Sequence, residues 1–179
     1  FAGSGSEGFA NGTGTDALFR YPYDVAVDGS GNVYVGDDGN RRIRKITSDG
    51  VVTTLAGNGS PGSYNGTGTD ATFLNSMGIA VDGSGNVYVA DKDNNKIRKI
   101  TAAGVVTTLA GSGSHGSDNG TGTAASFKNP RGVAVDGNGN VYVADTENHL
   151  IRKIATTLPN DSTTDNSTLP LIFTSSEAT

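Results

Sequence analysis

Short runs of alternating apolar and polar residues, separated by glycine-rich segments, fill most of the chain. In the first unit this alternation predicts four strands, at residues 24–28, 32–35, 42–46 and 51–55. The link Asp-Gly-Ser-Gly between the first two strands provides residues that tolerate positive φ, as a tight hairpin requires. In the connection before these strands, residues 16–19 predict one helical turn, which places Phe19 as a plug between neighbouring units.

The same pattern occurs three times at a constant spacing of 54 residues, without gaps. Four antiparallel strands per repeat, with a period above about 40 residues, are typical of a propeller blade. The sequence therefore predicts an all-β fold of three four-stranded antiparallel blades, at approximately 1–57, 58–111 and 112–158. Three flanking motifs keep the same register: phenylalanines at 19, 73 and 127, Ile-Arg-Lys-Ile runs at 43–46, 97–100 and 151–154, and Asn-Gly-Thr-Gly-Thr loops that begin at Asn11, Asn65 and Asn119.

The third unit contains the tripeptide Asn148-His149-Leu150, within a run of fourteen residues that ends at Ile154. This run resembles the NHL repeat, which is named after that tripeptide. The first two units have Asn-Arg-Arg and Asn-Asn-Lys in its place. The resemblance covers residues 1 to about 158. It implies a β-propeller, commonly six-bladed, that usually serves as an interaction platform, whereas a minority of relatives are hydrolases or lyases.

The third unit departs from the repeat after Ile154, where Ala-Thr-Thr-Leu replaces a turn and a fourth strand. The third blade is therefore expected to be incomplete. Because propellers typically need about 4 to 8 blades, three outcomes stay open: part of a longer propeller, two copies paired into a six-bladed ring, or copies joined head to tail into a fibre. Phe1 aligns with Leu55 at the end of a fourth strand, beside an open edge, and is an assembly candidate.

The segment after the repeats, residues 159–179, begins with a polar Ser/Thr-rich linker and continues with the β-prone run 169–174. Two interpretations of this run stay open. It is either a disordered end or a strand that completes its own blade, or a neighbour's, by β-addition. The second interpretation makes four of its residues assembly candidates, namely Leu169, Leu171, Ile172 and Phe173.

The formal net charge of −5 argues against nucleic-acid binding, which needs a basic surface, and against an anionic membrane surface. No window approaches the ~20 apolar residues of a membrane-spanning helix. The absence of cysteine excludes disulfides, thiolate metal sites and cysteine nucleophiles. The chain starts at Phe1 without a signal-peptide pattern, so it is expected to be a processed product, a fragment or part of a longer chain.

Catalytic and metal-binding patterns have little support in the sequence. His115 and His149 lie in different parts of the repeat and recur in no other unit, whereas a zinc site needs three or four ligands. His149 is expected to be a surface or packing residue. The run at 91–95 imitates the start of an EF-hand loop, but Lys96 and Ala102 occupy the positions of its glycine and its bidentate glutamate. We therefore expect no enzyme, no metal and no cofactor.

Three sets of repeated charged residues are expected to be structural. The second strand of each unit ends in an aspartate that can accept backbone N–H bonds from the following turn; a ring of carboxylates holding a cation at the channel mouth is the alternative. A second aspartate opens each hairpin, and Arg-Lys pairs are expected to keep their charged heads in water. The sets are Asp37, Asp91 and Asp145; Asp28, Asp82 and Asp136; and the pairs at 44–45, 98–99 and 152–153.

Six Asn-x-Ser/Thr sequons are candidate N-glycosylation sites. In a eukaryotic secreted protein the three repeated ones would carry glycans in a regular row, whereas in a bacterial protein they would be plain turn residues. The candidates are Asn11, Asn58, Asn65, Asn119, Asn160 and Asn166.

These patterns together predict a non-catalytic interaction and assembly module, extracellular or at the cell surface. Its expected partner is protein, either itself or further blades of a longer chain, and its contacts come from blade edges and inter-strand loops. Two alternatives stay open. One is a subunit of an extracellular, glycosylated fibre joined head to tail by strand addition. The other is a fragment of a propeller hydrolase or lyase whose catalytic blades are absent.

Overall fold

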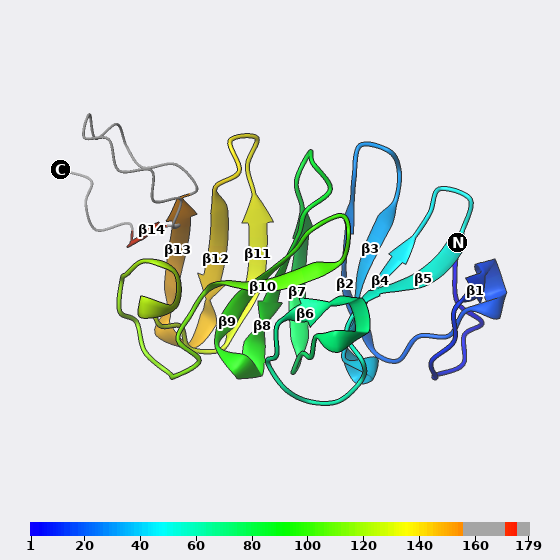
Figure 1. Cartoon of the computed structure of the whole chain (residues 1–179), viewed down its shortest axis with the longest axis horizontal. Helices are drawn as coiled ribbons and strands as arrows, with labels where there is room; N and C mark the ends of the chain where they lie inside the picture. Colours follow the sequence, from blue (N-terminus) through cyan, green and yellow to red (C-terminus); the bar gives the residue numbers. More distant parts are fainter. Residues whose placement is uncertain (156–170, 175–179) are drawn as a thin grey trace.

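The computed structural model describes residues 1–155 and 171–174, whose regular elements are strands and single 3-10 turns. The strands form three antiparallel sheets that follow one another in chain order. In Figure 1, blade 1 (blue to cyan) lies at one end of the molecule and blade 3 (yellow to orange) at the other, with blade 2 (green) between them. The expected all-β fold of antiparallel blades is confirmed.

Each blade has four main strands in the order of the chain. Blade 1 comprises β2 (Pro22–Val27), β3 (Val33–Asp37), β4 (Arg42–Ile46) and β5 (Val51–Ala56). Blade 2 comprises β7 (Ser76–Val81), β8 (Val87–Asp91), β9 (Lys96–Ile100) and β10 (Val105–Ala110). Blade 3 comprises β11 (Pro130–Val135), β12 (Val141–Asp145), β13 (Leu150–Ala155) and β14 (Leu171–Thr174). The first strands β2, β7 and β11 lie side by side at the centre of the array.

The glycine-rich connection before blades 1 and 2 runs along the outer edge of the blade that follows it. There β1 (Gly12–Thr13) pairs with β5 and β6 (Gly66–Thr67) pairs with β10, so these blades have a short fifth strand that the sequence did not predict. A two-residue strand is too short to show alternation, which is why the hydrophobic pattern gave no sign of it.

The helical turn expected at 16–19 lies two residues earlier. It is a 3-10 turn that Gly14 starts with φ of 56°, a conformation that glycine adopts without strain, and Ala17 after it is already extended. Such turns precede the first strand of each blade, and a second set joins the second and third strands. They are η1 (Gly14–Asp16), η3 (Gly68–Asp70) and η5 (Gly122–Ala124), then η2 (Asp38–Asn40), η4 (Lys92–Asn94) and η6 (Thr146–Asn148).

The hydrophobic core lies between blades. In the interface between blades 1 and 2, Tyr34 and Ile43 of blade 1 pack in one cluster with Phe73 of blade 2. The cluster between blades 2 and 3 repeats this arrangement with Tyr88, Ile97 and Phe127. Phe73 and Phe127 are fully buried, which confirms the predicted plug for two of the three repeated phenylalanines.

A buried arginine ties the connection before each blade to its sheet. In blade 2, Arg98 of β9 has no exposed side-chain surface, and its Nη1 donates to Asp91 Oδ2 at 2.8 Å and to the Thr72 carbonyl at 3.1 Å. Its Nη2 donates to the Tyr64 carbonyl and to Asn65 Oδ1, both at 2.9 Å. One guanidinium group therefore joins both limbs of the connection to the end of β8. We call this set of contacts the arginine clasp.

The clasp recurs in blades 1 and 3, where Arg44 pairs with Asp37 at 2.8 Å and Arg152 with Asp145 at 3.0 Å. The expectation that these arginine heads stay in water is therefore wrong. Acceptors on the connection and the aspartate bind both Nη groups of the guanidinium, which offsets part of the cost of removing it from water, while the Nε of each clasp arginine is buried without a hydrogen-bond partner. The neighbouring lysines stay partly exposed. In each blade the guanidinium carbon also lies over a phenylalanine ring, at 5.1 Å from Phe19, 5.2 Å from Phe73 and 5.2 Å from Phe127.

An asparagine completes each clasp. Asn94 Nδ2 donates to Asp91 Oδ2 at 2.9 Å and to the Gly62 carbonyl at 2.8 Å, while Asp91 Oδ1 accepts the Leu74 N–H at 2.9 Å. The structural role of the repeated aspartate is thus confirmed, although the backbone donor precedes the sheet and does not belong to the following turn. These bonds explain why the first residue of the repeated tripeptide is constant, as Asn40, Asn94 and Asn148.

The hairpin aspartates are turn residues, as predicted. Asp28 Oδ1 accepts the N–H groups of Ser30 and Asn32, both at 2.9 Å, and Oδ2 accepts from the Asn32 side chain and the Tyr34 hydroxyl. The hydrogen bond from the Asn32 side chain lowers the pKa of Asp28. Burial, followed by the hydrogen bond to Asp28, raises the pKa of Tyr34 to about 12. The first hairpin is therefore held by a charged acceptor and a neutral phenol.

The strand β14 is the fourth strand of blade 3. It pairs antiparallel with β13 and places Ile172 opposite Ile154 and Phe173 opposite Lys153. In blade 2, Val106 lies opposite Ile100 in the same register, so Ile172 takes the place of Val106. Of the interpretations left open for the run 169–174, the structure has the strand, within its own blade. Leu169 lies outside the described residues.

Replacing Arg98 with methionine should lower the free energy of unfolding by about 3–5 kcal/mol, because Asp91 would remain buried without its counterion. Urea denaturation measures this change. The double variant Asp91→Leu/Arg98→Met should recover part of the loss, since no uncompensated charge remains. The matched control, Lys99→Met at the partly exposed neighbour, should stay within about 0.5 kcal/mol. An equally small effect of Arg98→Met would contradict the role of the clasp.

Candidate functional site

Two sheet faces of the array have no blade packed on them among the described residues. We call the sheet surface that points toward the preceding blade the leading face, and the surface that points toward the following blade the trailing face. Each interior cluster joins the trailing face of one blade to the leading face of the next. The leading face of blade 1 and the trailing face of blade 3 are therefore the open faces of the described array.

The leading face of blade 1 is apolar and is exposed along β2, whereas Val35 and Ile46 deeper in the face are buried. Val25 and Val27 of β2 are 58% and 60% exposed, whereas Ile79, the counterpart of Val25 in blade 2, is 4% exposed. This exposed part of the sheet is therefore a candidate interaction surface. The residues that define the leading face are Phe19, Val25, Val27, Val33, Val35 and Ile46.

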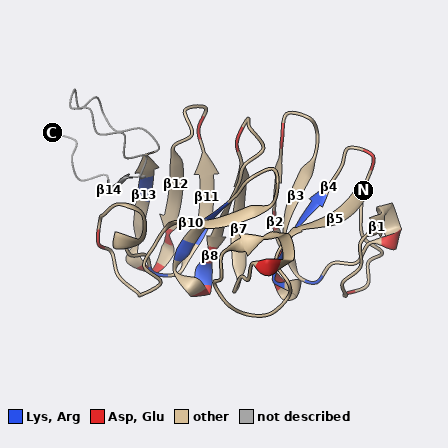
Figure 2. Ribbon diagram, viewed as in Figure 1, with Lys and Arg blue, Asp and Glu red and all other residues tan. Residues whose placement is uncertain are grey.

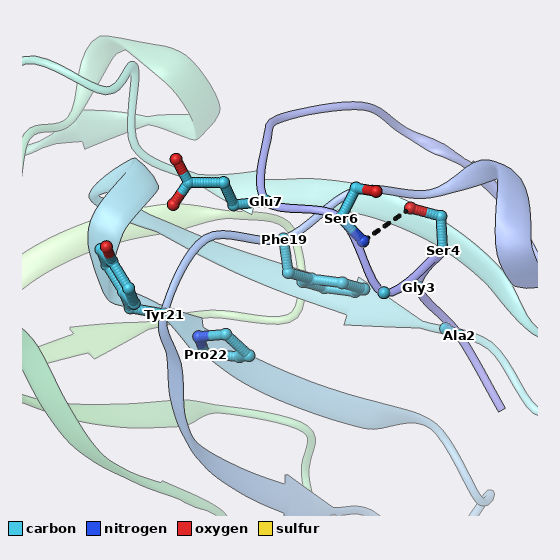
Figure 3. Close-up of a pocket in the computed structure, with 9 residues that line it drawn as sticks. Ala2, Gly3, Ser4, Ser6, Glu7, Phe19, Tyr21 and Pro22 are labelled. Atoms are coloured by element: carbon cyan, nitrogen blue, oxygen red, sulfur yellow. Dashed lines mark hydrogen bonds between the residues drawn. The ribbon is translucent and has the colours of Figure 1, made fainter.

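An open pocket of about 480 Å³ borders the leading face, between residues 2–7 and the start of β2. Figure 3 shows the Phe19 ring lying between Gly3 and Pro22, with Tyr21 and Glu7 at the pocket's other side. A second, apolar hollow continues from it over the valines of the sheet and is lined by Phe1. The assembly candidate Phe1 therefore lies on the leading face.

The trailing face of blade 3 has the same character. Ile151 of β13 is 63% exposed, whereas its counterpart Ile97 in blade 2 is fully buried under blade 3. Tyr142 and Ala144 beside it are partly exposed, although Tyr88 and Ala90 are buried. Both ends of the array thus present surfaces that are core elsewhere in the same chain.

Charge does not distinguish either open face. In Figure 2, acidic and basic residues are spread over all three blades and gather into no single patch. At the pocket beside the leading face, Glu7 and Arg20 face each other at 3.8 Å, both well exposed. Apolar contact, with shape rather than charge, is what this site offers a partner.

The candidate chemical groups are dispersed or already engaged. Within the described residues, no group of three His, Cys, Asp or Glu side chains is placed to hold a metal ion. His115 and His149 are both exposed, and His149 takes the left-handed conformation that follows η6. Asp91 of the EF-hand-like run is buried against Arg98. The alternative of a carboxylate ring around the channel is wrong for the same reason, since Asp37 and Asp145 are buried in clasps too.

No helix in the described part of the chain is long and apolar enough to cross a membrane. The repeated sequons lie at exposed positions on the connections. In each, asparagine Oδ1 accepts a clasp hydrogen bond, as Asn11 does from Arg44 at 2.9 Å, while an N-glycan is attached at Nδ2. Asn58 is also exposed, and Asn160 and Asn166 lie outside the described residues.

Sequence reasoning did not single out Val25, Val27 or Ile151 as contact residues. They are repeated apolar strand positions, and in the sequence they look the same as Ile79, Val81 and Ile97. The signal that could have identified them is positional, because a blade at either end of an array exposes residues that its interior copies bury.

Comparison with known families identifies the repeat. The family model of the NHL repeat matches residues 127–154, and that of the teneurin NHL domain matches residues 61–120. The chain therefore contains repeats of the NHL type. This agrees with the resemblance seen in the sequence, and the constant asparagine of the NHL tripeptide is the clasp residue described above.

Two curated relatives show how much longer such proteins are. The chain is 29% identical over 169 residues to Protein SUPPRESSOR OF QUENCHING 1, chloroplastic, of Arabidopsis thaliana, an alignment that covers 86% of this chain and 16% of the relative. It is 40% identical over 77 residues to NHL repeat-containing protein 2 of Gallus gallus, covering 42% of this chain and 10% of the relative. The NHL chain thus spans less than a fifth of the length of these relatives.

A solved structure confirms the propeller fold. The NHL chain superposes on an auxiliary nutrient binding protein from Bacteroides ovatus with a TM-score of 0.68 at 25% sequence identity. The match covers 80% of this chain and 39% of that one. The three blades therefore correspond to a sector of a longer propeller chain.

Truncations at the same repeat position should destabilise an interior leading face much more than the open leading face of blade 1. Ile79→Ala is expected to cost about 2–5 kcal/mol of stability, because it opens a cavity in the interface between blades 1 and 2. Val25→Ala, at the same repeat position in blade 1, should stay within about 0.5 kcal/mol. Urea unfolding of dilute protein measures both. Equal losses would mean that the leading face of blade 1 is already covered in the dilute chain.

Proposed function

We propose that this chain is a non-catalytic, extracellular NHL-repeat module that works by protein contact, and that the leading face of blade 1 is its main binding surface. The supporting observation is the contrast between Val25, 58% exposed, and Ile79, 4% exposed at the same repeat position. This surface is exposed in blade 1 and core in blade 2, so it has the composition to receive another blade-like surface.

Three features make contact a better proposal than catalysis. The residues of the open face are apolar, as those of a protein interface core are. The pocket beside it is lined by glycine, serine and apolar side chains together with Glu7 and Tyr21, and brings together no acid–base pair or nucleophile with its base. The carboxylates that recur in every blade serve the clasps and the hairpins.

An introduced thiol can test the leading face directly, because the chain has no cysteine of its own. Val25→Cys should react quickly with a thiol reagent in dilute protein. Its labelling rate should fall by about tenfold or more when unlabelled wild-type chain is added up to high micromolar concentration, since a covered thiol reacts only after the complex opens.

Ser48→Cys serves as the matched control, because this exposed turn residue of blade 1 lies outside the leading face. Its labelling rate should not depend on the concentration of wild-type chain. If Cys at position 25 reacts as fast as Cys at position 48 at every concentration, the leading face binds no second chain and the proposal fails.

The extracellular part of the proposal rests on the exposed row of repeated sequons. Secretion from a eukaryotic host should therefore yield a mass above the 18.1 kDa of the chain. Digestion with a peptide N-glycosidase should remove the excess, and the variant Asn11→Gln/Asn65→Gln/Asn119→Gln should lack most of it. Intact mass spectrometry measures all three. An unmodified mass for the secreted wild-type chain would contradict glycosylation of the row.

A further inference from the structure

We infer that the leading face of blade 1 binds the trailing face of blade 3 of a second copy of this chain, and that two such joints close a ring of six blades. The inference rests on the proposed function. It adds to it the occupant of the leading face, the contacts that form the joint and the size of the assembly.

The apolar positions of the interior interfaces are retained at both open faces. On the leading face, Phe19, Val27, Val33, Val35 and Ile46 of blade 1 match Phe127, Val135, Val141, Val143 and Ile154 of blade 3. On the trailing face, Ala134, Tyr142 and Ile151 of blade 3 match Ala26, Tyr34 and Ile43 of blade 1.

The loop beside the leading face already has the shape that receives a preceding blade. Gly57 has φ of 97°, and a Cβ built on it would meet the Arg41 carbonyl oxygen of blade 1 at 2.6 Å, so two backbones approach closely there. Gly3 has φ of 103°, but a Cβ on it would meet only Phe19 of its own blade, at 3.4 Å. The docking geometry of blade 1 is therefore formed before any partner arrives, which lowers the ordering cost of binding.

A polar contact of the interior interfaces also has its counterpart at the open ends. Arg41 Nη1 donates to the Gly59 carbonyl at 3.3 Å, and Asn95 Nδ2 donates to the Gly113 carbonyl at 3.2 Å. In blade 3 the corresponding residue is His149, with φ of 57°, close to the 52° and 51° of Arg41 and Asn95. At the joint, an imidazole N–H of His149 thus donates to the Gly5 carbonyl of the other copy.

The joint is heterologous, since a leading face meets a trailing face, so copies must either close into a ring or extend into a fibre. Two copies of three blades give six, within the range of about 4 to 8 blades in which propellers close. Three copies would exceed that range. A closed pair also uses every open face, which a fibre never does at its ends.

Light scattering on the full chain, with two exposed residues changed in turn to aspartate, tests the joint. The wild type should have twice the 18.1 kDa of one chain at high micromolar concentration. Val25→Asp and Ile151→Asp should each reduce it to the mass of one chain. An equimolar mixture of the two variants should restore the doubled mass, because the intact trailing face of one meets the intact leading face of the other. Because the mixed pair has one intact joint instead of two, its dissociation constant should be at least tenfold higher than that of the wild-type pair.

The control variant is Val51→Asp, the same change at an exposed valine of β5 that belongs to neither open face, and it should keep the doubled mass. Circular dichroism spectra and urea unfolding midpoints should show that all three variants fold. This is expected because Val25 and Ile151 are mostly exposed in the single chain.

Three results would overturn the inference. If Ile151→Asp keeps the doubled mass, blade 3 does not take part in the joint. If the thiol of Val25→Cys is nevertheless protected from labelling, the leading face still binds protein, but its occupant is not blade 3. A wild-type mass that keeps growing with concentration would exclude a closed pair. A wild type that stays at the mass of one chain throughout would exclude the joint altogether, and unprotected Cys at position 25 would then remove the proposed function as well.

Discussion

The buried arginine of each clasp is the interaction on which the rest of the structure depends. The connection between blades is rich in glycine and serine, so it has few apolar side chains with which to hold itself against a sheet. Ordering such a segment costs about 1–2 kcal/mol per residue in backbone entropy. Arg98 supplies four hydrogen bonds at one point, to the aspartate at the end of β8 and to both limbs of the connection. Phe73 follows directly after Thr72, one of the acceptors, and lies against the guanidinium. Fixing the connection therefore also fixes the plug that fills the interface between blades, and local electrostatics sets the packing of the array.

The period, the strands and the hairpin turns of this fold could be predicted because each is written in residues close together in the chain. Asp28 and the residues that it binds lie within six positions of each other, and apolar and polar residues alternate along β2 and β3. The clasp could not be predicted in this way. The acceptors of Arg44 on the connection lie 26 to 34 positions away in sequence, and the pattern Ile-Arg-Lys-Ile contains no sign that its arginine points inward and its lysine outward. The strand β14 presented a similar difficulty, since its sequence was compatible with a strand but its partner was not specified by any local feature.

The candidate site lay beyond the sequence for a different reason. The sequence predicts contacts at unpaired strand edges and at the tail, because exposed backbone groups recruit strands. The structure points instead to the two sheet faces. Val25 and Ile79 are nearly the same residue in the same motif, and only their place in the array makes one of them surface and the other core. Repetition thus hides the proposed site, because the sequence shows what the blades have in common and not which blade has a neighbour in the array.

The energetics of a repeat array make those open faces consequential. In such arrays stability is approximately the sum of a term for each unit and a term for each interface between neighbours. Within one chain, three blades share two interfaces, and two apolar faces have no neighbouring blade among the described residues. A closed pair of chains has six blades and six interfaces, so each blade gains a full set of neighbours and no apolar face is left in water. The gain per chain is one interface of the kind that already holds the array together, with Phe19 in the place of Phe127 and Ile151 in the place of Ile97. Association is opposed by the loss of translational and rotational freedom, about 4–15 kcal/mol. That cost is met once for the pair, whereas the gain is made at two joints, and this asymmetry favours the ring over a single open contact.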